Sequence, residues 1–231
     1  MTRRLVTSAL VLILGLTAFT HAQPRPPRIV IAKLFDDAYR QGGFDYTYPP
    51  SAKIEITKTG GYRSPAALKI DLDNNDYSGA SICLYNEVFD LSKNLLDGAL
   101  EFYIKGAKGG EQIKVGLLDE EISDNKKTQV ILPLNPYVQI TKKWQKVVIP
   151  LADFPERGLY WDQDKKVELP SYMDFDKVAE VRFSADKGVN AGGATIWVDN
   201  IEFVKGTVKK SKPKPKQTYW DEKVEVVNGP A

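Results

Sequence analysis

The stretch ALEFYIKG, residues 99–106, alternates apolar and polar side chains with a period of two. Leu100, Phe102 and Ile104 fall on one face of an extended strand, whereas Glu101 and Tyr103 fall on the other. This pattern predicts a β-strand with one face in a hydrophobic core and a second face that is either solvated or the floor of a groove.

The same period extends outward over nine further segments, separated by Gly, Asn and Pro pairs such as Gly60-Gly61 and Asn135-Pro136. These segments are residues 28–35, 53–59, 66–73, 80–85, 112–120, 128–134, 144–151, 179–185 and 194–204. About ten short strands with almost no amphipathic helix predict an all-β sandwich. One short helical turn is expected over residues 173–179.

The first 22 residues have the pattern of a secretory signal, with Arg3 and Arg4 before an apolar run and a small residue, Ala22, at the end. The run is too short and interrupted for a membrane span. We therefore expect cleavage after Ala22 and a secreted or periplasmic protein.

Removing residues 1–22 takes away two arginines and the only histidine, His21, which leaves 30 basic and 30 acidic residues. Without histidine the mature chain has no Ser-His-Asp or Cys-His mechanism and no imidazole ligands for zinc. The balanced charge argues against nucleic acid as a partner. Cys83, the single cysteine, is expected to be a small buried residue with no intramolecular disulfide.

The composition divides the remaining chain into three parts. Residues 23–27 form a Pro-rich leader, residues 28–205 the β-sandwich domain, and residues 206–231 a Lys/Pro-rich linker with a short C-terminal segment. The linker is interpreted as a solubilising spacer, with contact to an anionic polymer as the alternative.

The order of these segments resembles a known family. The matching segments are residues 64–84, 90–92, 100–120, 142–154, 178–186 and 192–204. Together they look like the galactose-binding-like jelly roll of bacterial carbohydrate-binding modules, in particular family 11 and its relatives. Trp144 and Trp197 match positions of that family that are mostly structural, so we expect both rings in the core. The resemblance implies a jelly-roll β-sandwich that binds polysaccharide or oligosaccharide without catalysis.

The resemblance also implies a structural calcium ion where the first and last strands meet. Asp199 takes the position of the closing-strand carboxylate, and Asp36 and Asp37 follow the first strand. Backbone carbonyls would complete the six to eight oxygens that calcium needs, because residues 58–65 supply no acid. The alternative is that Asp199 caps a bulge or pairs with a lysine.

Two other acidic segments are interpreted as structural. Residues 71–79 begin like a calcium loop, but Asp76 and Ile82 stand where an EF-hand needs Gly and Glu, so a polar turn is favoured. Residues 119–124 resemble the acidic strand of jelly-roll glycosidases. Ser123, however, takes the third position on that face, so catalysis there is not expected.

The predicted glycan site lies on the strand faces that carry tyrosines and charges. The residues assigned to it are Tyr85, Glu101, Tyr103, Tyr160, Trp161 and Arg182. Tyr85 and Tyr103 are expected to stack on sugar faces, while Glu101 and Arg182 bond to hydroxyls. Tyr160 and Trp161 lie in a predicted loop, either as a platform at one end of the groove or as a lid packed over a sheet edge.

Two other functions remain open. The same fold could serve as an envelope structural or assembly protein that binds a protein partner, which a large exposed apolar patch would favour. The enzymatic alternative is a histidine-free polysaccharide lyase, with Tyr103, Lys105 and Arg182 side by side in a groove. We favour the non-catalytic module.

Overall fold

The computed structural model describes residues 27–74, 77–84, 87–120 and 127–208. The predicted signal (1–22), all but the last residue of the leader (23–27) and all but the first three residues of the segment 206–231 lie outside the described residues, and so does Tyr85. The boundaries expected for these parts therefore remain predictions.

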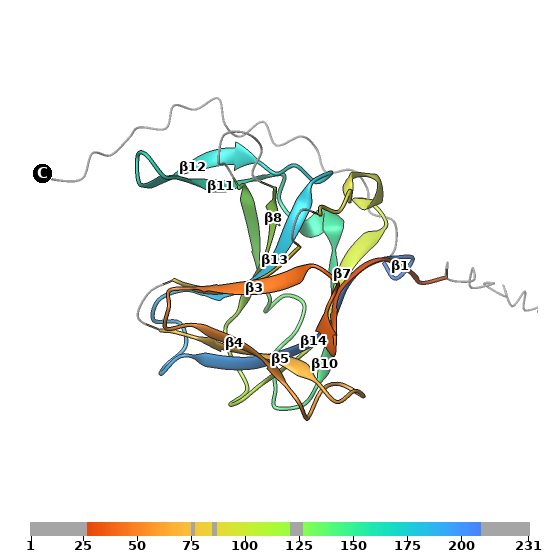
Figure 1. Cartoon of the computed structure of the whole chain (residues 1–231), viewed down its shortest axis with the longest axis vertical. Helices are drawn as coiled ribbons and strands as arrows, with labels where there is room; N and C mark the ends of the chain where they lie inside the picture. Colours follow the sequence, from red (N-terminus) through yellow and green to blue (C-terminus); the bar gives the residue numbers. More distant parts are fainter. Residues whose placement is uncertain (1–26, 75–76, 85–86, 121–126, 209–231) are drawn as a thin grey trace, which may run out of the picture.

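The described chain forms two seven-stranded sheets in which every strand pair is antiparallel (Figure 1). Sheet A contains β1 (Ile29–Asp36), β2 (Ala38–Tyr39), β4 (Lys53–Thr57), β5 (Ala67–Leu72), β7 (Gly98–Gly106), β10 (Gln145–Pro150) and β14 (Ala194–Lys205). Sheet B contains β3 (Gly43–Tyr48), β6 (Ser78–Leu84), β8 (Lys114–Asp119), β9 (Gln129–Pro133), β11 (Arg157–Asp162), β12 (Val167–Tyr172) and β13 (Val178–Ala185). Two short 3-10 helices, η1 (Ser92–Asn94) and η2 (Leu151–Asp153), lie in the connections.

Each sheet is organised around a long central strand. In sheet A, the twelve-residue β14 pairs with β5 and β7 along its first half and with β7 and β1 along its second half. In sheet B, the order is β12-β11-β9-β8-β13-β6-β3, so that β3 and β12 are the two edges. In Figure 1 the β11–β12 hairpin projects at the top, away from the lower layer that holds β4, β5 and β14.

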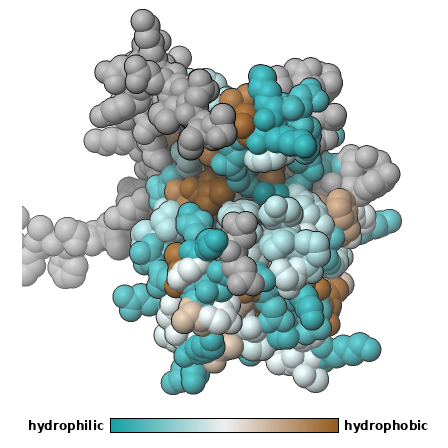
Figure 2. Space-filling view, turned by 90° about the vertical axis from the view of Figure 1, so that its left-hand side faces the viewer, coloured by the Kyte–Doolittle hydropathy of each residue, from teal (hydrophilic) through white to brown (hydrophobic). Residues whose placement is uncertain are grey.

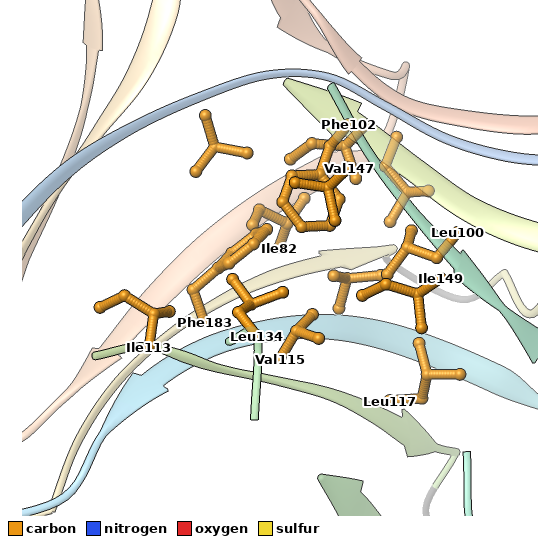
Figure 3. Packing of buried hydrophobic residues seen from close by; sticks show 14 of the residues in the cluster. Ile82, Leu100, Phe102, Ile113, Val115, Leu117, Leu134, Val147, Ile149 and Phe183 are labelled. Atoms are coloured by element: carbon orange, nitrogen blue, oxygen red, sulfur yellow. The ribbon is translucent and has the colours of Figure 1, made fainter. Parts of the chain in front are cut away.

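The core lies between the sheets and follows the predicted alternation. Leu100, Phe102 and Ile104 of β7 are fully buried. Leu100 and Phe102 face Phe183 and its neighbours on sheet B (Figure 3). The rings of Phe102 and Phe183 meet edge to face, 5.2 Å between centroids. Because each such side chain contributes about 1.5–3 kcal/mol when buried, this layer supplies the main stabilisation of a fold without a disulfide.

The predicted all-β sandwich is confirmed, and the ten predicted segments correspond to β1, β4–β10, β13 and β14. Four further strands, β2, β3, β11 and β12, were not predicted. The helical turn expected over residues 173–179 is wrong: Lys177 N donates to Asp174 O (3.0 Å) in a simple turn before β13 begins at Val178. Met173 and Phe175 are drawn into the core, which explains their apolar spacing without a helix.

Candidate functional site

A groove crosses the outer face of sheet B from β3 to β11, and its cavity has a volume of about 630 Å³. Strand register creates it, because residues paired across neighbouring strands point to the same side. Tyr46 pairs with Ser81, which pairs with Arg182, and Leu118 pairs with Gln129 in the adjacent row. The inner-face residues between them fill the core, so the polar residues line the outside.

Three aromatic side chains and one leucine form the two walls of the groove. On the β3 side stand Tyr46 and Tyr48, and on the β11 side stand Leu159 and Trp161. The side chains at the rims are open to solvent, 62% for Tyr48 and 48% for Trp161. In Figure 2 hydrophobic residues gather in the upper half of the face shown, with hydrophilic residues beside them. Exposed aromatic rings around a hollow are typical of a ligand site.

Arg182 organises the floor. Its Nε donates to Ser81 Oγ (2.8 Å) and its Nη1 donates to Gln129 Oε1 (2.5 Å). Its Nη2 donates to the Tyr46 hydroxyl (2.5 Å), and the Tyr46 ring lies 5.7 Å from the guanidinium carbon. The planar guanidinium therefore fixes side chains from β3, β6 and β9 in one arrangement.

A buried carboxylate balances this cation. Glu180 is 1% exposed and accepts hydrogen bonds from the Tyr46 hydroxyl (2.7 Å) and from Lys127 Nζ. Burial raises the pKa of the Tyr46 phenol, while the Arg182 charge opposes that rise. Tyr46 therefore stays a neutral hydroxyl at physiological pH, and the floor is a set of fixed neutral and paired groups.

The structure brings together only part of the predicted glycan site. Arg182 and Trp161 both line the groove on sheet B. Tyr160 lies in β11 on the opposite face from Trp161, because the two are consecutive in a strand. The predicted loop around this pair is therefore wrong. Tyr160 and Trp161 therefore do not form one platform.

Glu101 and Tyr103 lie elsewhere. Both are on β7, with side chains on the outer face of sheet A, so the prediction of one groove that also holds Arg182 is wrong. The side-by-side arrangement of Tyr103, Lys105 and Arg182 required by the lyase alternative is wrong for the same reason. Tyr62 stacks on Tyr103, with 3.5 Å between ring centroids and 14° between planes.

Sequence reasoning missed Tyr46, Tyr48 and Tyr77. The signal was the i, i+2 spacing of Phe44, Tyr46 and Tyr48 in β3, which places three rings on one face of a strand. No purely apolar face accompanies them, and Gly42-Gly43 and Pro49-Pro50 flank the segment, so it lacked the usual signature of a strand.

Trp144 and Trp197 were also placed wrongly in the core. Both are half-buried and lie outside the core cluster. Their rings flank Lys105, whose Nζ lies 4.7 Å from the Trp144 centroid and 5.2 Å from that of Trp197. They belong to the outer face of sheet A.

Of the three predicted calcium ligands, Asp199 and Asp37 accept hydrogen bonds from residues 62–66, whereas Asp36 does not. Asp199 is fully buried; its Oδ2 accepts from Tyr62 N (2.7 Å) and Ser64 Oγ (3.1 Å). Burial raises the pKa of Asp199, and the charge of Asp37 nearby contributes to the rise. Asp36 instead pairs with Lys33 Nζ (2.5 Å).

Within the described ranges, no group of three or more Asp, Glu, His or Cys residues is placed to hold a metal ion. The Asp37–Asp199 pair, whose like charges repel each other, is what remains of the expected site, and two carboxylates are only a partial fit to the six to eight oxygens of calcium. In the part of the chain that the structure describes, no helix has the length and apolar character needed to cross a membrane.

Comparison with known proteins gives a family and a set of structural relatives. A sequence model of the family Carbohydrate binding domain 30 matches residues 32–205. The family 30 carbohydrate-binding module of the cellulosomal cellulase Cel9D-Cel44B of Clostridium thermocellum is 22% identical, with a TM-score of 0.58 over 76% of this chain and 98% of that chain. A further family 30 module is 22% identical, with a TM-score of 0.60 over 80% of this chain and 92% of that one.

A family 11 module from Clostridium thermocellum, solved in complex with a β-1,3-1,4-mixed-linked tetrasaccharide, is 16% identical. Its TM-score is 0.55 over 77% of this chain and 96% of that chain. At these identities the solved structures establish a shared fold. No match was found among curated proteins.

Proposed function

Because the chain belongs to the family Carbohydrate binding domain 30 and is a non-catalytic carbohydrate-binding module, we propose that it binds a neutral polysaccharide chain in the groove of sheet B. Membership confirms the predicted resemblance to jelly-roll carbohydrate-binding modules, although the matching family is 30 and family 11 is a structural relative. It also agrees with the prediction that the chain is not an enzyme.

The observation that supports this site most directly is the pairing of exposed aromatic walls with a fixed polar floor. Tyr48 and Trp161 present ring surface on opposite sides of Arg182 and Gln129. The C–H face of a pyranose stacks on such a ring, while its hydroxyls require hydrogen-bonding groups between the rings. A groove that crosses the sheet from β3 to β11 suits a chain rather than a single sugar.

The floor is assembled before any ligand arrives. Arg182 already holds Ser81, Gln129 and Tyr46, so few side chains lose freedom when a glycan binds. Each rotamer-rich side chain that must be ordered on binding costs about 0.5–1.5 kcal/mol. Preorganisation therefore compensates for the small contact area of an oligosaccharide.

Substitution of the wall tests this proposal. We expect Trp161→Ala to weaken binding of the β-1,3-1,4-mixed-linked tetrasaccharide about 10- to 100-fold, because stacking and burial of the indole are both lost. Isothermal titration calorimetry and affinity electrophoresis on soluble β-glucan measure the change. Tyr172→Ala is the matched control, since Tyr172 is an exposed aromatic (66%) on the same hairpin outside the groove. Equal binding by wild type and Trp161→Ala would overturn the site.

We further propose that Asp37 and Asp199 hold a calcium ion, without Asp36. Support comes from the burial of Asp199 and from the segment that both carboxylates bind, since Asp199 accepts from Tyr62 N and Ser64 Oγ and Asp37 accepts from Ala66 N. A divalent cation would also offset the repulsion that raises the pKa of Asp199. When bound, the ion would tie the end of β1 to β14. Excess chelator should then lower the melting temperature, and an unchanged melt would retire the proposal.

Export with cleavage after Ala22 is the remaining proposal. Residues 1–22 carry the charge and hydrophobicity pattern of a secretory signal, and polysaccharide ligands of this kind are encountered outside the cytoplasm. N-terminal sequencing of the protein recovered from an expressing bacterium tests it. A mature N-terminus at Gln23 is expected, and a retained Met1 in the exported fraction would contradict the assignment.

A further inference from the structure

A second cavity lies on the outer face of sheet A, on the opposite side of the sandwich from the groove. Its volume is about 510 Å³, and its lining includes Arg28, Tyr62, Glu101, Tyr103 and Lys146. These residues come from β7, β10 and the segments preceding β1 and β5. None of them takes part in the sheet B groove, so this cavity is a separate feature of the molecule.

One carboxylate oxygen in this cavity lacks a donor. Glu101 is only 2% exposed, and its Oε2 accepts from Arg28 Nε (3.0 Å) and pairs with Lys146 Nζ (2.9 Å). Its Oε1 is buried and has no hydrogen-bond partner among the described residues. A buried acceptor left unsatisfied costs about 1–3 kcal/mol, more when it is charged. A ligand donor in the cavity would recover that cost once the Glu101 side chain turns Oε1 toward it.

The charges around Glu101 indicate what kind of donor fits. Arg28 also pairs with Glu202, which pairs in turn with Lys33 (3.3 Å), and Lys33 pairs with Asp36. Three cations and three carboxylates are therefore linked in one network of zero net charge. A cationic or anionic ligand would unbalance it, whereas a neutral hydroxyl donates to Oε1 without adding charge.

An aromatic row continues from the cavity along the sheet. Tyr62 stacks on Tyr103 and meets Trp144 edge to face, 6.2 Å between centroids. Trp144 and Trp197 then flank Lys105. All four rings are half-buried, so each keeps some surface in contact with solvent. Rings beside buried polar groups form the combination that sugars require.

We propose that this cavity is a second saccharide-binding site, in which Glu101 Oε1 accepts a hydrogen bond from a sugar hydroxyl. Tyr62 and Tyr103 form the wall beside it, and Arg28 and Lys146 hold the Glu101 carboxylate in place. The choice of a saccharide rests on the proposed function, but the site itself uses the opposite sheet. One module could then bridge two polysaccharide chains, or two segments of one chain.

Nuclear magnetic resonance of the ¹⁵N-labelled full chain, titrated with the β-1,3-1,4-mixed-linked tetrasaccharide, tests the proposal. We expect saturable shifts of the Tyr62, Arg63 and Ser64 amides in the wild type, and the same shifts in Trp161→Ala, which removes the groove wall. Amides of this segment that do not move at millimolar saccharide would overturn the second site. Groove amides that do not shift in the wild type, while those of residues 62–64 do, would overturn only the first site.

The role of Glu101 has its own variant. Glu101→Gln keeps the shape but removes the charged acceptor, and we expect at least about tenfold weaker binding at this cavity, with groove binding unchanged. Glu55→Gln is the control, because Glu55 pairs with Lys69 in the same sheet away from the cavity. Unchanged affinity in a folded Glu101→Gln protein would refute the assigned contact; if that variant does not fold, the wild-type amide shifts decide.

Discussion

Arg182 connects three strands through single hydrogen bonds to Ser81, Gln129 and Tyr46. A lysine has a point charge and cannot reproduce this planar fork. We expect Arg182→Lys to weaken tetrasaccharide binding about tenfold, with retention of the strand signal in circular dichroism. Arg40→Lys is the control, because Arg40 makes one surface pair with Glu87 (3.1 Å). Binding that equals wild type would show that the fork is dispensable.

Asp199 gives a pH dependence with a definite sign. Burial raises its pKa, and the charge of Asp37 adds to the rise. A carboxyl whose pKa rises on folding contributes stability below its unfolded value of about 3.9, and that contribution is lost as the pH rises through the folded value. In chelator, the melting temperature of wild type should therefore exceed that of Asp199→Asn by more at pH 5 than at pH 7.5.

Calcium reverses this trend if the proposed site is correct. At pH 7.5, calcium at about 100 times its dissociation constant should stabilise the wild type by about 2.7 kcal/mol. Asp199→Asn should not respond, and Asp36→Asn should respond like the wild type because Asp36 pairs with Lys33. Thermal melts with and without calcium provide the comparison, and a calcium response lost in Asp36→Asn would restore the original three-ligand assignment.

At the scale of single residues, the sequence predicted which strand face some site residues occupy, but not which residues lie next to them in the fold. Arg182 was found because a charge on an outward strand face is visible in the alternation, and the structure places it in the groove. Glu101 and Tyr103 show the same pattern in β7, yet they lie in the other sheet. Alternation assigns a face within one strand, but sheet membership depends on long-range pairing that a single sequence does not reveal.

At the scale of elements, the strands that carry the groove walls were the ones missed. β3 has polar or aromatic residues on both faces, and β11 and β12 extend beyond the core, so none shows an apolar stripe. Pro170 within β12 also argues against a strand, although an edge strand tolerates it. The core strands could be predicted because burial of one face requires apolar residues at every second position. The strands of the site are exposed to solvent and carry no such requirement.

Two consecutive residues of β6 allow a test of the groove, because Gly79 faces the groove and Ala80 faces the core. A Cβ at Gly79 would stand 3.4 Å from Arg182 Cδ, an ordinary contact, so Gly79→Val should fold. We expect it to fill the floor and abolish measurable tetrasaccharide binding. Ala80→Val should do the reverse, destabilising the packed core by about 1–3 kcal/mol while leaving the groove open. Paired calorimetry and thermal melts separate the two outcomes, and full binding by Gly79→Val would place the ligand elsewhere.

At the scale of the whole molecule, the charges on the groove floor and around Glu101 are already paired. The chain has 32 basic and 30 acidic residues, and the floor pairs Arg182 and Lys127 with Glu180. Both proposed sites therefore offer fixed dipoles and rings rather than an open field of one sign. A neutral glycan is recognised by such surfaces without help from long-range attraction.

Salt distinguishes this mode of recognition from binding of an anionic polymer. Raising sodium chloride from about 0.05 to 0.5 M shortens the screening length from roughly 14 to 4 Å, which weakens exposed charge pairs but not stacking or buried hydrogen bonds. We expect the dissociation constant for the mixed-linked tetrasaccharide to change less than about twofold over this range by calorimetry. An acidic polysaccharide, offered as the comparison ligand, should bind only weakly and lose that binding at high salt. A steep salt dependence for the neutral tetrasaccharide would mean that unpaired cations, rather than aromatic walls and the Arg182 network, supply the affinity.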